Sequence, residues 1–176
     1  MRNEKKFLWI LFLGSLFAYP FTIIRKSPIK DWIIVFSLVG LISGIIDKIL
    51  TEKGFLKYPT TILKNLGISG TFDFMLCPLM NVIFNQFTYK DRPIYIFLKV
   101  LLFTTPMSLF EKWLEKNTSL IRWRNGWSWY HTFFSITLKY LAIRSIMGFI
   151  RYLSKVQTKL IGRDKDYHAS EAGREK

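Results

Sequence analysis

The sequence has few of the residues from which most catalytic and metal sites are built. Its 176 residues include one Cys and two His. The lone Cys77 excludes an intramolecular disulfide framework, and one Cys with two distant His residues makes no zinc site. The H-E-x-x-H, G-x-S-x-G and Gly-rich phosphate-loop motifs are also absent. We therefore predict no cofactor and no metal, and no catalytic residue can be assigned, although an enzyme is not excluded.

Acidic residues are scarce as well, so the chain is strongly basic. It has 26 Lys and Arg against 12 Asp and Glu, a formal net charge of +14. This balance excludes an acidic disordered chain and favours an anionic partner surface. Nucleic acid is a poor partner, because the basic residues flank apolar stretches and form no separate domain. With 50% hydrophobic residues, the composition predicts a small basic membrane protein.

Long apolar stretches fill most of residues 1–143. The first, residues 7–24, has no formal charge and would extend about 27 Å as a helix, close to the thickness of a bilayer core. No small-x-small cleavage site follows it, so we expect a retained anchor. The predicted spans are 7–24, 32–50, 65–89, 94–110 and 127–143, and all six Trp residues lie at or near their ends. We predict an all-α bundle of about five transmembrane helices, a multi-pass protein of the cell membrane.

Three features inside these spans predict the shape and packing of the helices. Gly40 and Gly44 have the spacing that lets another backbone approach one helix face, although the same spacing also arises by chance. The third span contains Pro78, which should kink it. Along one side of that span, a polar residue recurs at every fourth position: Asp73, Cys77, Asn81 and Asn85.

This polar stripe has two interpretations. A carboxylate inside the bilayer is costly unless it is protonated, hydrated or paired, so the stripe should face other helices or a cavity. In the structural interpretation, its acid and amide groups hydrogen-bond across helices and fix their packing. In the functional interpretation, Asp73 is a proton or cation site on a transport path. Lys99 and Lys139 are candidate cationic partners, although Lys99 can also snorkel toward the membrane surface.

Paired carboxylates occur at the end of the fourth span, where Glu111 and Glu115 are one helical turn apart. Such a pair could serve acid and base chemistry or hold a divalent metal. No His or second acidic pair is spaced to complete either site. A solvated helix end is therefore the simpler interpretation.

The sequence changes character after residue 143. Residues 144–161 predict an amphipathic helix, with its basic residues within about 80° of one another on a helical wheel and apolar residues opposite. The basic residues are Arg144, Arg151, Lys155 and Lys159. We expect this face to bind anionic lipid headgroups, and the alternative is a solvated extension of the fifth helix. Residues 162–176 lack apolar periodicity and are expected to form a flexible tail.

A set of short motifs follows in a recognisable order between residues 65 and 130. They are Phe72-Asp73 with Pro78, Asn85-Gln86-Phe87, Pro93, Phe110-Glu111 and Trp127–Tyr130. In this order the chain resembles a family of uncharacterised small integral membrane proteins from endospore-forming Gram-positive bacteria. The resemblance implies a multi-spanning protein of the cytoplasmic membrane, with no established activity. It also makes Asp73, Gln86 and Glu111 the first positions to test.

The leading functional hypothesis is a binding or assembly component of the membrane, with lipid and other membrane proteins or a second copy of the chain as partners. The alternative is a small transporter or channel component that uses Asp73. Lys and Arg are almost equally divided between the two sides of the membrane, so their count does not fix the orientation. The basic helix favours a cytoplasmic C-terminus, which with five spans places the N-terminus outside.

Overall fold

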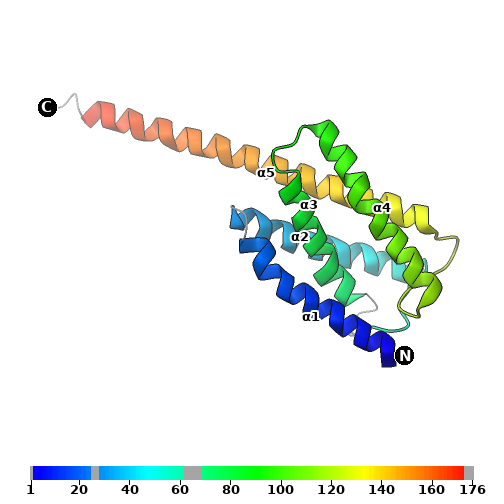
Figure 1. The fold of residues 1–176 in the computed structure, drawn as a ribbon. Coiled ribbons are helices and arrows are strands. Elements are labelled where there is room, and N and C mark those ends of the chain that lie inside the picture. The colour runs from blue at the N-terminus through cyan, green and yellow to red at the C-terminus, as the bar shows by residue number, and fades with distance from the viewer. Residues whose placement is uncertain (1, 25–27, 62–68, 173–176) are drawn as a thin grey trace. The chain divides into compact units, whose positions relative to one another are not determined.

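The computed structural model describes residues 2–24, 28–61 and 69–172, with side chains for residues 4–24, 28–61 and 69–161. In this part of the chain, helices are joined by turns and by one pair of very short strands (Figure 1). The elements are α1 (Arg2–Ile24), α2 (Ile29–Glu52), β1 (Leu56–Lys57), η1 (Phe72–Leu76), α3 (Cys77–Phe87), α4 (Pro93–Asn117), β2 (Arg122–Trp123) and α5 (Trp129–Ala172). The chain divides into two units, Met1–Ile143 and Arg144–Lys176.

The first unit is a bundle with two distinct ends. At one end, strands β1 and β2 pair antiparallel, with Leu56 opposite Trp123, and we call this the strand end. The N-terminal helix also reaches the strand end, where Glu4 Oε1 accepts a hydrogen bond of 2.6 Å from the backbone N–H of Ser119. At the opposite end, the start of α2 meets the turn after α3, and the rings of Trp32 and Tyr89 are 5.9 Å apart. We call this the turn end.

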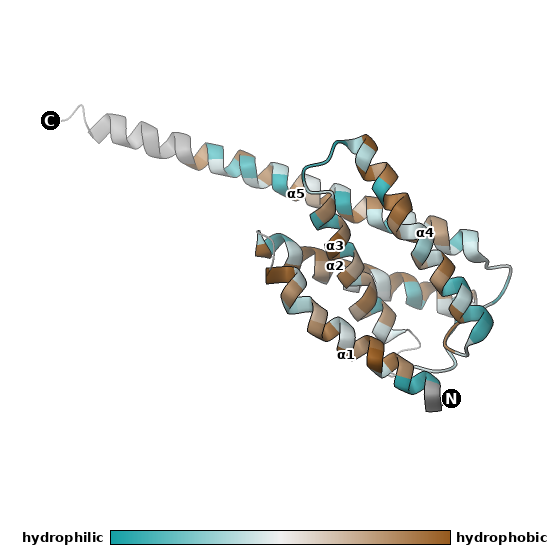
Figure 2. Cartoon of the chain, viewed as in Figure 1, coloured by the Kyte–Doolittle hydropathy of each residue, from teal (hydrophilic) through white to brown (hydrophobic). Residues whose placement is uncertain are grey.

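Four helices are long and apolar enough to cross a membrane: Glu4–Ile24, Ile29–Glu52, Pro93–Asn117 and Trp129–Ile161. Hydrophobic residues cover long parts of α1, α2 and α4 (Figure 2). Large apolar side chains face outward, for example Phe21 and Phe134, which are 76% and 67% exposed. Polar side chains such as Asn81 and Thr104 are fully buried instead. This inverted polarity is what an apolar solvent favours, and it supports the prediction of an all-helical protein with membrane-crossing helices.

The connection from α2 to α4 runs the length of the bundle. It begins near the strand end, where the backbone N–H of Ser69 is 3.3 Å from Asp47 Oδ2 on the last turns of α2. It reaches the turn end at Gln86, whose Nε2 donates to the carbonyl of Thr22 near the end of α1 at 2.7 Å. Residues 70–87 are helical throughout, a length of about 27 Å. The predicted third span, 65–89, thus corresponds to η1 and α3, although residues 62–68 lie outside the described part.

The helix has a wider turn just before Pro78, the residue at which we predicted a kink. Proline lacks an N–H, and its ring clashes with the carbonyl four residues earlier. Immediately before it, η1 has π-helical hydrogen bonds, and the N–H of Cys77 donates to the carbonyl of Phe72, five residues back. A hydroxyl from α1 supports this turn, because Tyr19 donates to the carbonyl of Met75. The backbone therefore absorbs the proline by widening one turn of the helix.

The sequence led us to expect that another backbone would approach Gly40 and Gly44. Instead, an aromatic ring packs against them. A Cβ atom at Gly40 would be 3.5 Å from Cδ1 of Phe74, and one at Gly44 would be 3.1 Å from its Cζ. Both glycines therefore line one recess on α2, into which η1 inserts an aromatic side chain. The physical advantage is the predicted one, since the absence of side chains allows close packing.

Three helices continue beyond the ends of the predicted spans and of the predicted basic helix. Helix α2 extends to Glu52, so Asp47 is a buried helical residue, 7% exposed. Helix α4 extends to Asn117, so Glu111 lies inside it and not beyond its end. Helix α5 extends to Ala172, past residue 161, where we expected a flexible tail to begin. The tail has no proline before Ala172 and is rich in good helix formers, so the backbone hydrogen bonds continue.

The second unit is the remainder of α5 from Arg144. Lys155 and Lys159 are exposed, as are Leu153 and Leu160, at 49% and 56%. The predicted amphipathic helix 144–161 is thus helical, although it is not a separate element, since α5 begins at Trp129. This part of the helix therefore exposes both basic and apolar side chains, whereas Arg144 and Arg151 are only partly exposed.

Candidate functional site

A cavity of about 410 Å³ lies inside the bundle, toward the strand end. Its wall is mostly apolar and is built from every helix of the first unit and from the connectors next to β1 and β2. Four charged-type side chains interrupt the apolar wall: Asp47 from α2, Asp73 from η1, Glu111 from α4 and Lys139 from α5. The fold therefore brings three carboxyl groups and one amine from four different helices to a single cavity.

Asp47 is held by the connector that follows β1. Its Oδ1 accepts a hydrogen bond of 2.7 Å from the hydroxyl of Tyr58, and its Oδ2 is 3.3 Å from the backbone N–H of Ser69. Burial, together with the nearby carboxyl group of Asp47, raises the pKa of Tyr58 well above its usual value. The phenol therefore keeps its proton and remains a donor to Asp47.

Glu111 is held by the other connector and by the start of α5. Its Oε1 accepts hydrogen bonds from the hydroxyl of Thr132 at 2.9 Å and from the indole N–H of Trp123 at 3.1 Å. Thr132 in turn accepts a hydrogen bond of 3.0 Å from the indole of Trp127. A carboxyl group with two neutral donors is positioned firmly, and its other oxygen can serve a ligand.

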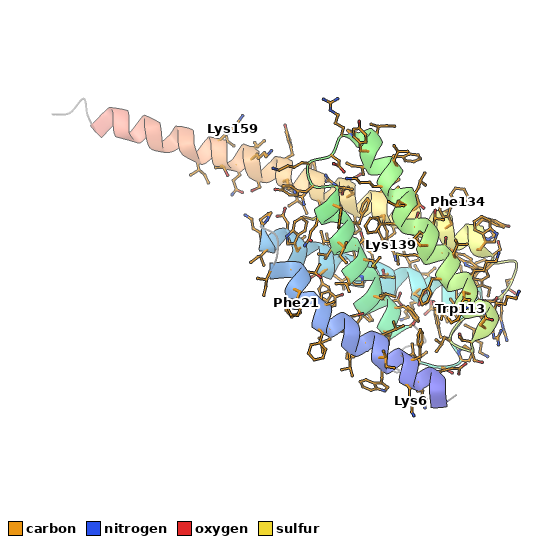
Figure 3. All side chains as sticks on the ribbon, viewed as in Figure 1. Lys6, Phe21, Trp113, Phe134, Lys139 and Lys159 are labelled. Carbon is orange, nitrogen blue, oxygen red and sulfur yellow. The ribbon has the colours of Figure 1, made fainter. Side chains whose placement is uncertain are left out.

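Asp73 differs from the other two carboxyl groups because one of its oxygens, Oδ2, is both fully buried and without a partner among the described residues. The residue is 7% exposed, and among the described residues no hydrogen-bond donor contacts its Oδ2. Lys139, labelled in Figure 3, comes from α5. It lines the same cavity, and its Nζ donates to the hydroxyl of Ser43 at 2.9 Å. A buried oxygen without a donor carries a free-energy cost, which a ligand with a matching group would remove.

The remaining members of the polar stripe follow Asp73 along the helix toward the turn end. Cys77 lines the cavity, whereas Asn81 and Asn85 are fully buried. Asn85 donates to the carbonyl of Asn81 at 3.0 Å, but its Oδ1 has no partner among the described residues. Neither side-chain atom of Asn81 has one either. The stripe therefore does face other helices and a cavity, and part of its hydrogen-bonding capacity is unused.

Other candidate residues lie outside the cavity. Gln86 binds the last turn of α1, where the carbonyl of Thr22 needs a donor. Lys99 is not a partner of Asp73, because its Nζ is 2.6 Å from Asp91 Oδ2 near the turn end. Glu111 lines the cavity, whereas Glu115, one helical turn later, is not among the described residues that line it. Arg144, Arg151, Lys155 and Lys159 belong to the second unit.

Asp47 and Tyr58 are site residues that the sequence alone did not predict. Asp47 ends an apolar run next to Lys48, a pattern that usually marks a solvated helix end. Asp47 nevertheless shares one face of α2 with Ser43 and Gly44, since it follows them by four and three residues. The small residues Gly40, Ser43 and Gly44 form one face of the helix, and the next residue on that face is Asp47. This spacing could have predicted Asp47, whereas no local pattern predicts Tyr58.

The site is suited to noncovalent binding of a small molecule. Its volume lies within the roughly 300–1,000 Å³ typical of small-molecule pockets, and apolar walls with few polar groups are also typical. Among the described residues, no group of three or more His, Cys, Asp and Glu is placed to hold a metal ion. The three carboxyl groups line a common cavity, in which Asp73 lies within hydrogen-bonding reach of Asp47.

The comparisons with family models, with curated proteins and with solved structures found no match to the chain. The resemblance of residues 65–130 to small bacterial membrane proteins accordingly stays a prediction. The function has to be argued from the cavity itself.

Proposed function

We propose that the chain is an integral protein of the cell membrane whose helix bundle binds a small molecule in the cavity around Asp73. The observation that carries this proposal is Oδ2 of Asp73, which has no hydrogen-bond partner among the described residues, in a residue only 7% exposed on the wall of a cavity of about 410 Å³. An internal void and a buried oxygen without a hydrogen bond each lower the stability of a folded protein. Selection for stability alone would therefore be expected to remove both. A bound ligand accounts for both features at once.

The lone cysteine provides a direct test of access to this cavity. Cys77 lines the cavity, and Ser135 lines it from α5. With the protein in nanodiscs, we expect N-ethylmaleimide to label Cys77 and Ser135→Trp to slow labelling severalfold by filling the space. Leu138→Trp is the matched control, since Leu138 is on the same helix and 70% exposed. Absence of labelling, or equal labelling of Ser135→Trp and wild type, would contradict an accessible binding cavity.

A second candidate function is transport of a proton or small cation past Asp73. The specific observation that favours it is that both amide atoms of Asn81 and the amide oxygen of Asn85, which continue the polar stripe beyond the cavity, have no partner within the described part of the chain. In proteoliposomes, a flux that is lost in folded Asp73→Asn but retained in Glu52→Gln would support transport. Glu52 is an exposed carboxylate on α2 that pairs with Lys48. Equal loss of folding and flux would instead support a packing role.

The remaining parts of the proposal concern the membrane. We place η1 and α3 as a fifth crossing, because they carry the chain from one end of the bundle to the other. We place the basic face of residues 144–161 on anionic lipid headgroups of the cytoplasmic leaflet, where each Lys or Arg contributes about 1 kcal/mol. Association with other membrane proteins or with a second copy stays a prediction.

A further inference from the structure

The cavity has an imbalance of charge that restricts what it can bind. Asp47, Asp73 and Glu111 contribute three carboxyl groups, whereas Lys139 is the one basic residue among the described residues that line it. Lys139 also directs its amine to the hydroxyl of Ser43 at 2.9 Å. An anionic ligand would meet three acids and one amine, so the electrostatic balance disfavours it.

The three carboxyl groups are not equally satisfied. Asp47 has Tyr58 and the N–H of Ser69 as donors, and Glu111 has Thr132 and Trp123. Among the described residues, Asp73 has a buried oxygen with no donor and lies beside the carboxyl group of Asp47, so it is the carboxyl group most in need of a cation or an added donor. The position that a ligand's charged group should take is therefore next to Asp73.

The rest of the wall determines what the charged group must be attached to. Four aromatic residues line the cavity, namely Tyr58, Phe72, Phe110 and Trp127, together with Leu, Ile and Met side chains. Such a wall cannot replace the water around a small metal ion. It can bury an apolar body, and aromatic faces attract an organic ammonium group.

We propose that this cavity binds a small organic cation, an ammonium group carried by an apolar body, with the ammonium beside Asp73. This inference rests on the proposed function, since it names the class of ligand for the same cavity. Cation–π attraction and the carboxyl groups act together on the ammonium, while the aliphatic and aromatic wall covers the body.

The test compares two probes that differ in charge and hardly in shape. Phenethyltrimethylammonium carries a permanent positive charge, and (3,3-dimethylbutyl)benzene is its neutral carbon analogue. The full chain is held in nanodiscs of zwitterionic lipid, and each probe is scored by how far it protects Cys77 from N-ethylmaleimide. We expect the cation to protect at a concentration about tenfold or more below that of the neutral analogue. Equal protection by the two probes would overturn the inference.

Variants identify the group that recognises the charge. Asp73→Asn should reduce the preference for the cation to near unity, while Glu52→Gln, an exposed carboxylate on α2, should leave it unchanged. If the Asp73→Asn variant does not purify as a monodisperse protein, Asp73→Glu is tested in its place. We then expect the ratio of the two protecting concentrations to differ from the wild-type ratio. A full preference retained in a folded Asp73 variant would overturn the assignment.

The inference and the proposed function fail in different ways. If both probes protect Cys77 equally, the cavity binds small molecules but does not select cations, so only the inference is lost. If Cys77 reacts equally in Ser135→Trp and no probe protects it, the binding function itself is lost, and the inference with it.

Discussion

At the scale of single residues, the recess on α2 makes a quantitative prediction. An alanine at Gly44 would place its Cβ 3.1 Å from the ring of Phe74, whereas one at Gly40 would be at 3.5 Å, an ordinary contact. We expect Gly44→Ala to lower the free energy of unfolding by about 1 kcal/mol relative to Gly40→Ala, because the ring must shift. Unfolding of the purified protein in mixed micelles would measure the difference.

The same contact supplies the control for this prediction. If the ring is the cause, Phe74→Leu should remove the difference between the two alanine variants, since the shorter side chain vacates the space near Gly44. The contact assignment would be wrong if the Gly44 and Gly40 variants unfold alike, or if the difference persists in the Phe74→Leu background.

Some site residues were predictable one at a time, but their convergence was not. The four-residue spacing of Asp73, Cys77, Asn81 and Asn85 defines one face of a helix, so the sequence is enough to group them. Glu111 was a candidate from the resemblance, yet nothing local relates it to Asp73. Their common cavity depends on how α4 packs against η1 and α3, which is a property of tertiary structure.

At the scale of elements, the basic part of α5 predicts binding to anionic lipid. A peptide of residues 144–161 should bind vesicles that contain anionic lipid, with its basic side chains toward the headgroups. Arg151→Glu with Lys155→Glu reverses two charges, and at about 1 kcal/mol for each lost cation it should weaken binding at least about tenfold. Vesicle sedimentation at low salt would measure this change.

The control for the lipid prediction preserves charge. Arg151→Lys with Lys155→Arg keeps both cations and should bind nearly as wild type does, whereas high salt should weaken both by screening. Unchanged binding of the doubly reversed peptide at low salt would refute the assignment of this face.

The elements themselves were predictable where the physical signal is local. Apolar runs located α1, α2, α4 and the start of α5, because a helix is the only single-segment structure that satisfies its backbone in lipid. Pro78 predicted an irregular third helix, but not that η1 would be π-helical. The pairing of β1 with β2 joins residues more than 60 positions apart, so no local pattern predicts it.

At the scale of the whole molecule, the cavity lies toward the strand end of the bundle, where the acidic residues of α2 and α4 also lie. Asp47 and Glu111 are near the C-terminal ends of α2 and α4, and Thr132 is near the N-terminal end of α5. These ends meet at the strand end, where the connectors supply Tyr58 and Trp123 as donors. Acidic groups near a helix end stay closer to the membrane surface, where their burial costs less than at mid-bilayer. A ligand would therefore have a short path to water.

The orientation of the bundle determines which compartment supplies that ligand. With five crossings and a cytoplasmic C-terminus, the N-terminus and the strand end face outside, and the turn end faces the cytoplasm. Lys57 in β1 and Lys90 in the turn after α3 are exposed and mark the two ends. In a Cys77→Ser background, a membrane-impermeant maleimide applied to intact cells should label Lys57→Cys and leave Lys90→Cys unlabelled until the membrane is permeabilised.

The two possible contrary results of this labelling have different meanings. If Lys57→Cys and Lys90→Cys are labelled from the same side, residues 70–87 do not cross, and the bundle has four spans with both termini in one compartment. If only Lys90→Cys is labelled in intact cells, five crossings stand but the orientation is inverted. The cavity would then open toward the cytoplasm, and the basic face of residues 144–161 would lie on the outer leaflet, where the anionic surface potential of the cytoplasmic leaflet cannot act on it.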